Sequence, residues 1–185
     1  MKVFRTFIFF CLYLTFTYSS AADKYKIINK LNSIDNIQFN FTQKTNEKVE
    51  RGKCILAFPN KLKCNYEDKN EKELIINKKM MAITQKRYGK SLFYPLNKST
   101  FLNILSKKEL IKIIKKSEST ADKYLNIIFI SKENSKTLIR FNKDDFLLAG
   151  WVSSDQYNNK VIFEIEIISI NQIIDESIFR LPNKG

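Results

Sequence analysis

This chain of 185 residues contains no histidine, and it has few glycines (four), prolines (three) and cysteines (three). The lack of histidine excludes Ser/His/Asp triads, Cys/His dyads and most zinc sites. The glycines, Gly52, Gly89, Gly150 and Gly185, are too scattered to build a Gly-rich loop that cradles phosphate. These absences argue against most classes of enzyme.

Acidic pairs are the remaining candidates for catalysis. Asp144 and Asp145 are adjacent, while Glu164 and Glu166 alternate with apolar residues such as Phe163. Such alternation places both glutamates on one face of a strand, which we expect to be in water. We therefore expect no enzymatic activity. An exported hydrolase of the Asp/Glu or Ser/Lys type is the alternative.

The beginning of the chain has the pattern of a secretory signal peptide. Two basic residues precede the apolar run Phe7–Phe16, and small residues follow, so that cleavage is expected after Ala21 or Ala22. The alternative is an uncleaved anchor, but the run is shorter than the roughly 20 residues that span a bilayer. We expect residues 1–22 to be removed and residues 23–185 to form one exported domain.

Two cysteines remain once Cys11 has left with the signal. Export exposes Cys54 and Cys64 to an oxidising compartment. A three-residue turn at positions 58–60 (Phe-Pro-Asn) would place them directly opposite each other on paired strands. This favours a cross-strand disulfide, worth ~3 kcal/mol, over two free thiols in the core.

The chain is strongly basic, with 32 Lys and Arg against 19 Asp and Glu, for a net charge of +13. Such an excess attracts anionic surfaces, which include phospholipid headgroups and acidic proteins. We expect no nucleic-acid partner, because an exported protein rarely meets nucleic acid. The alternative is that the lysines are merely solvated.

Apolar periodicity predicts short helices among many strands. An amphipathic helix is expected at 23–35, with Tyr25, Ile28, Leu31 and Ile34 on its apolar side. Helices are also expected at 97–105, with Ser99 as N-cap, and at 175–179. The segment 107–116 fits either a helix or an edge strand.

Alternation predicts a strand over residues 37–41, with Phe39 and Phe41 on one face. Further strands are expected at 49–58, 61–67, 73–76, 80–84, 92–94, 124–131, 136–142, 146–154 and 160–170. Consecutive strands with short links imply an antiparallel meander. Taken alone, the apolar mass on these strands favours an ordinary core. However, a curved sheet with only two or three helices would leave an apolar cavity.

Four segments and a short C-terminal motif carry a resemblance to a known family. They are LNSIDNIQFNFTQK, GKCILAFPNKLKCNYED, YPLNKSTFLNIL and GWVSSDQYNNKVIFEI, followed by FRLP. In this order, they make nearly all of the mature chain similar to the LolA family of periplasmic outer-membrane lipoprotein carriers.

The resemblance implies an unclosed antiparallel β-half-barrel whose hydrophobic cavity is covered by a small helical lid. The cavity would hold the acyl chains of a lipoprotein. A periplasmic monomer would take this cargo from an inner-membrane ABC transporter to a receptor at the outer membrane, and no cofactor is needed. The expected lipid-binding residues are Phe39, Phe41, Leu56, Phe58, Phe93, Phe101, Leu102, Leu105, Ile128, Trp151, Phe163 and Ile165.

One position departs from the family. Well-known members have an arginine before the hairpin proline, where it helps to close the lid, whereas this chain has Phe58. Lys61 or Lys63 could instead hold lid carbonyls. The alternative function is a LolA-like lipid-binding or envelope-stress sensing module that does not shuttle cargo.

Overall fold

The computed structural model describes residues 19–96, 101–131, 135–155 and 157–183. The expected signal run Phe7–Phe16 and the expected N-cap Ser99 lie outside these ranges. Among the described residues, no helix is both long enough and apolar enough to cross a membrane.

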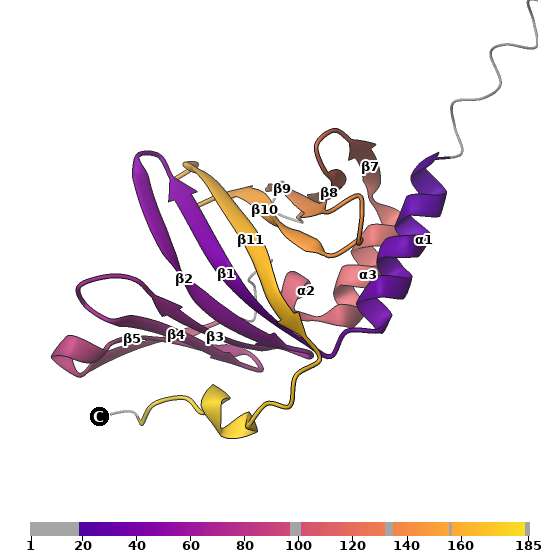
Figure 1. The fold of residues 1–185 in the computed structure, drawn as a ribbon. Coiled ribbons are helices and arrows are strands. Elements are labelled where there is room, and N and C mark those ends of the chain that lie inside the picture. The colour runs from indigo at the N-terminus through magenta and orange to yellow at the C-terminus, as the bar shows by residue number, and fades with distance from the viewer. Residues whose placement is uncertain (1–18, 97–100, 132–134, 156, 184–185) are drawn as a thin grey trace, which may run out of the picture.

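One antiparallel sheet of eleven strands forms most of the fold (Figure 1). The strands are β1 (Asn36–Thr45), β2 (Lys48–Ala57), β3 (Lys61–Tyr66), β4 (Lys72–Asn77), β5 (Met80–Gln85), β6 (Lys90–Pro95), β7 (Glu118–Ala121), β8 (Leu125–Ile130), β9 (Lys136–Phe141), β10 (Leu148–Ser154) and β11 (Lys160–Ile170). Their order in space is β6-β5-β4-β3-β2-β1-β11-β10-β9-β8-β7. The sheet therefore consists of two meanders joined by β1 and β11, and it is unclosed as predicted.

The short polar strand β7 is the one strand of this sheet that the sequence pattern missed. Its sequence, ESTA, has neither apolar alternation nor a β-branched cluster. Such a segment becomes a strand only because it pairs with β8, from Glu118 opposite Ile128 to Ala121 opposite Leu125. Tertiary pairing here overrides a weak local preference.

The ambiguous segment 107–116 is a helix, α3 (Lys107–Lys116). Ser106 precedes it in an extended conformation, and its side-chain oxygen accepts a hydrogen bond from the Glu109 backbone N–H. This N-cap satisfies one of the free donors at the start of the helix. The preceding helix α2 (Phe101–Leu105) covers the second half of the predicted 97–105.

Helix α1 (Ser19–Asn32) confirms the predicted N-terminal helix, but with a rotated apolar side. Ile27 and Leu31 are buried, whereas Tyr25 is 67% exposed, so its predicted inward position is wrong. The apolar residues of this helix fit two overlapping faces, and periodicity alone does not choose between them. Packing against α3 selects the face that carries Ile27 and Leu31.

The β2–β3 hairpin confirms the predicted disulfide. Cys54 and Cys64 are directly paired in the register, and their sulfur atoms are 2.02 Å apart. Both cysteines are buried in the core, where Phe39 of β1 lies opposite Cys54. The bond therefore ties β2 to β3 beneath the apolar interior.

The end of the chain covers the other face of the sheet. The predicted helical turn is present as η3 (Glu176–Phe179), a 3-10 helix capped by Asp175. Phe179 is fully buried, and its carbonyl oxygen accepts a hydrogen bond from Asn77 Nδ2 at 3.1 Å. Figure 1 shows η3, the yellow helical turn, beneath β3 and β4. Helices and this C-terminal segment thus cover opposite faces of one sheet.

The disulfide closes a short loop, because its cysteines are ten positions apart. We expect the double variant Cys54→Ala/Cys64→Ala to lose about 3 kcal/mol in the free energy of unfolding. Denaturant unfolding of the variant, compared with wild type with and without reductant, measures this loss. Unchanged unfolding of wild type on reduction would contradict a stabilising bond.

Candidate functional site

The inner face of the sheet is the face that carries Phe39 and Phe41. Directly paired residues of antiparallel strands point to the same side. Leu56 pairs with Ile37 of β1, two residues before Phe39, and Ile165 pairs with Phe41. Burial alternates along β1 in the same way, and Ile37, Phe39 and Phe41 are each more than nine-tenths buried. The inner face is therefore the apolar side of the central strands.

Four aromatic rings form a continuous row across this inner face. The rings of Tyr66 and Phe41 meet edge to face, with centroids 4.9 Å apart. Phe41 stacks on Phe163 at 5.1 Å, and Phe163 stacks on Trp151 at 4.2 Å. Their strands, in order, are β3, β1, β11 and β10. We call these four residues the aromatic row.

Gly52 makes the first contact of the row possible. It lies on β2 between Phe41 and Tyr66, with which it pairs on either side. A Cβ atom at this position would lie 2.8 Å from Phe41 Cε1 and 2.1 Å from the Asn65 backbone oxygen. Only glycine leaves room for the Phe41 ring to reach across β2 to Tyr66.

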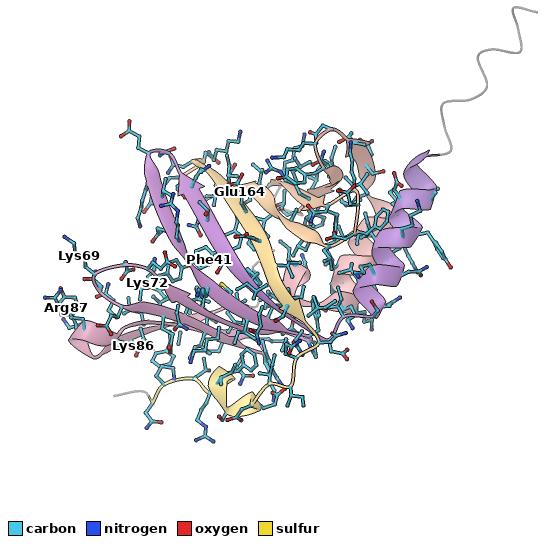
Figure 2. The ribbon with its side chains drawn as sticks, viewed as in Figure 1. Phe41, Lys69, Lys72, Lys86, Arg87 and Glu164 are labelled. Carbon is cyan, nitrogen blue, oxygen red and sulfur yellow. A yellow bond between two sulfur atoms is a disulfide. The ribbon has the colours of Figure 1, made fainter. Side chains whose placement is uncertain are left out.

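A charged cluster ends the row at Tyr66. Lys72 is labelled in Figure 2. Its Nζ lies 3.6 Å from the centroid of the Tyr66 ring and also donates a hydrogen bond to Glu50. Burial opposes ionisation of Glu50, but the hydrogen bonds and charges of Lys72 and Lys48 outweigh it and hold its pKa below the usual value. Burial, followed by the charges of Glu50 and Asp68, raises the pKa of Tyr66 to about 12. Apolar surface thus gives way to charge at this end.

The other end of the row borders a small pocket beneath the helices. Its volume is about 50 Å³. It is lined by Asn103, Ile104, Ile113, Phe129, Thr137, Ile139, Trp151 and Ser153. Ligand pockets for molecules of drug size usually measure roughly 300–1,000 Å³. This pocket is therefore much smaller than a typical ligand pocket.

Helices α2 and α3 form the lid over this pocket. Leu105 and Ile104 of α2 and Leu110 of α3 are buried in the core. The Asn60 backbone N–H donates a hydrogen bond of 2.9 Å to the Leu105 carbonyl oxygen, which joins the β2–β3 turn to the end of α2. Lys107 Nζ lies 5.5 Å from the centroid of the Phe58 ring in the same turn. The hairpin turn thus holds the closed lid.

A larger hollow lies outside the interior, where the C-terminal segment meets the opposite face of the sheet. It measures about 380 Å³. Gln38, Lys53, Cys54, Ile55, Lys63, Asn65, Ile168 and Ile178 line it. Within the described ranges, no group of three or more His, Cys, Asp or Glu side chains is arranged to bind a metal ion. The aromatic row and its lid therefore remain the main candidate site.

The family model described as "Outer membrane lipoprotein carrier protein LolA" matches residues 32–182. This chain belongs to the LolA family. Among curated proteins, no sequence matches it significantly.

Solved structures similar to this chain have very low sequence identity to it. An uncharacterized conserved protein from Thermus thermophilus has a TM-score of 0.54 and 9% identity, covering 88% of this chain and 94% of its own. A DUF1329 family protein from Desulfovibrio piger has a TM-score of 0.50 and 8% identity, and the match covers 89% of this chain and 98% of that protein. A LolA superfamily protein from Nitrosomonas europaea has a TM-score of 0.47 and 8% identity, with 89% and 99% covered.

Most of the residues expected to line a LolA cavity lie inside the fold. Those that are buried are Phe39, Phe41, Leu56, Leu105, Trp151 and Phe163. Phe58, Leu102 and Ile165 are partly buried against the same core. The side chain of Phe101, the first residue of α2, lies outside the described part of the structure. Their role in binding lipid remains a prediction.

Phe93 and Ile128 lie on the outer face, which corrects their expected position in the LolA cavity. Phe93 pairs with Ala82, and Ile128 pairs with Leu138. In each strand, these residues alternate with those that point to the inner face, so they point to the outer face. The strand LNIIFI is apolar on both sides, so alternation does not reveal which residues point inward. The inner positions of β8 are Leu125, Ile127 and Phe129, which sequence reasoning missed.

Among the described residues, neither Lys61 nor Lys63 holds the lid of this LolA-family chain, contrary to what the sequence had suggested. Lys61 pairs with Glu176 of η3, and Lys63 pairs with Glu73 at 3.5 Å. Both lysines alternate with the inward residues of β3, so their side chains point to the outer face. The contact that replaces them is the backbone hydrogen bond from Asn60, which has no side-chain signature.

Gly52→Ala tests the packing of the aromatic row. We expect a loss of about 3 kcal/mol in the free energy of unfolding, because the new methyl group clashes with the backbone of β3. Gly89→Ala is the control, since a Cβ there has nothing within 4 Å and only the positive φ of 60° is strained, which costs about 1 kcal/mol. Near-UV circular dichroism reports the rings. Equal losses in both variants would contradict the role of Gly52.

Proposed function

We propose that this protein is an exported carrier that shelters the acyl chains of lipoproteins and carries them from the inner to the outer membrane. The supporting observation is the continuous aromatic row on the inner face, covered by a lid of two short helices. The family description, outer membrane lipoprotein carrier, agrees with this use of the interior. Each buried methylene of a cargo chain contributes ~0.8 kcal/mol, so even partial shelter outweighs exposure to water.

The proposed carrier must open before it can load. A pocket of about 50 Å³ is too small for an acyl chain, and three of the four rings of the aromatic row are buried. We infer that α2 and α3 move away from the sheet and that cargo takes the place of their apolar side chains. Loading then exchanges one apolar contact for another. This keeps the net affinity low enough for release without nucleotide hydrolysis.

The proposed route begins with export and ends at the outer membrane. Cleavage after Ala21 or Ala22 would remove the first three or four residues of α1, which begins at Ser19. The buried residues Ile27 and Leu31 would remain, so the helix would keep its packing face. The proposed partners are an inner-membrane ABC transporter that supplies the lipoprotein and an outer-membrane receptor that accepts it.

Two isoleucines on opposite faces provide a matched test of the proposed cargo site. Ile165 points inward and Ile128 outward, and both are only partly buried. We expect Ile165→Asp to lower the amount of co-purifying lipoprotein or phospholipid at least tenfold, because a carboxylate opposes burial of an acyl chain. Ile128→Asp should change it less than about twofold. Native mass spectrometry of protein isolated from the periplasm measures the bound mass.

Circular dichroism of both aspartate variants controls for folding. Equal cargo in the two folded variants would contradict binding at the inner face. Cargo binding without transfer between membranes in a reconstituted assay would instead support a lipid-binding or sensing module that does not shuttle.

Hydrogen exchange at the Asn60 backbone amide reports the opening of the lid. The Asn60 amide donates to Leu105, whereas the Phe58 amide in the same turn donates to the Asp35 carbonyl oxygen, also at 2.9 Å. On saturation with palmitic acid, we expect hydrogen exchange at Asn60 to become at least tenfold faster and exchange at Phe58 to stay unchanged. Two-dimensional NMR measures both amides. Unchanged protection of Asn60 in the loaded protein would contradict opening by this route.

A further inference from the structure

Helix α3 carries a row of four exposed lysines that the carrier function does not use. They are Lys108, Lys112, Lys115 and Lys116, and each is exposed. At 100° per residue, their positions fall within one third of the helix circumference. We call these four residues the lysine stripe.

The opposite side of α3 belongs to the interior. Leu110 and Ile114 are fully buried, and Ile113 lines the pocket beneath the lid. One helix therefore covers the candidate cargo site with one face and presents the lysine stripe to solvent with the other. Whatever binds the stripe comes to rest on the lid itself.

Three members of the stripe are not neutralised. Among the described residues, Lys108, Lys115 and Lys116 have no carboxylate within 4 Å. Lys112 has one partner, Glu109, at 3.5 Å, and both side chains are largely exposed. Such a surface pair is weak. The stripe thus keeps a clear excess of positive charge.

Helix stability accounts for only part of this arrangement. Lys115 and Lys116 lie in the last turn, where cations interact favourably with the helix dipole. Lys108 lies in the first turn, where the same dipole disfavours a cation. Its charge therefore costs some local stability, and an external anionic partner would offset that cost.

The composition of the stripe distinguishes between two kinds of partner. Protein interfaces place aromatic residues and arginine at their centre and are depleted in lysine. The stripe consists of lysines alone. Diffuse attraction by several lysines is instead typical of binding to anionic lipid headgroups.

We propose that the lysine stripe of α3 docks on the anionic headgroups of a phospholipid bilayer. This docking places the lid against the membrane surface, beside the acyl chains that a carrier would collect or deliver. It does not require bound cargo, so it is tested separately from the proposed carrier function.

Vesicle sedimentation tests the docking with the mature protein. Vesicles of equal parts phosphatidylglycerol and phosphatidylcholine should bind wild type at low salt, and pure phosphatidylcholine should not. The triple variant Lys108→Gln/Lys112→Gln/Lys115→Gln should bind about a hundredfold more weakly, because each lysine near an anionic surface contributes to the attraction. Binding of wild type should also fall as salt rises.

The matched control removes the same charge elsewhere. Lys136 and Lys160 begin β9 and β11, Lys143 follows β9, and all three are exposed and lie outside α3. Their triple glutamine variant should weaken vesicle binding less than about fivefold. Equal weakening by both triple variants, or no vesicle binding by wild type, would overturn the proposal.

Binding of palmitic acid separates the two functions. The stripe variant should bind palmitic acid as wild type does, because the lysines do not line the interior. If vesicle binding fails while palmitic acid still binds, the carrier function stands and only the membrane docking is lost.

Discussion

Pairing of the first strand with the last holds the fold together. β1 lies between β2 and β11, so residues near the two ends of the chain form the centre of the sheet. Each meander contributes one neighbour to this central pair. The inner face of β1 thereby carries Phe41 into contact with rings from both halves, Tyr66 on one side and Phe163 on the other. Without this long-range pairing, the two meanders would have no common interior.

In the proposed carrier, the interior has to meet two opposed demands. It must be apolar enough to attract an acyl chain, yet an unclosed sheet cannot leave that apolar surface in water. The structure satisfies both by placing Leu105, Leu110 and Ile114 of the lid against the sheet. In the proposed carrier, these side chains occupy space that cargo would use, and the pocket beneath them is small. The affinity for cargo would then depend on competition between the lid and the cargo for the same surface, more than on the depth of the cavity.

Sequence reasoning succeeded where one face of an element is clearly apolar. β1 alternates strictly, and its inner residues Phe39 and Phe41 were predicted correctly. The same holds for the cysteines, because a short turn leaves one register in which they can meet. In each case, the local sequence is compatible with one arrangement only.

Prediction failed where tertiary packing makes the choice. β8 is apolar on both faces, so Ile128 and Ile127 are indistinguishable without knowing what lies above each. The size of the pocket also escapes sequence analysis, because it depends on how far the lid helices sink into the sheet. α3 illustrates the intermediate case: its pattern fitted two structures, and the Ser106 cap together with burial of Leu110 selected the helix.

The bond between Asn60 and Leu105 joins main-chain atoms only. Side chains at both positions can change during evolution without removing it, provided that the turn keeps its shape. Relatives with almost no recognisable sequence identity could therefore close their lids through the same hydrogen bond. Alignments of residues would not show that they do.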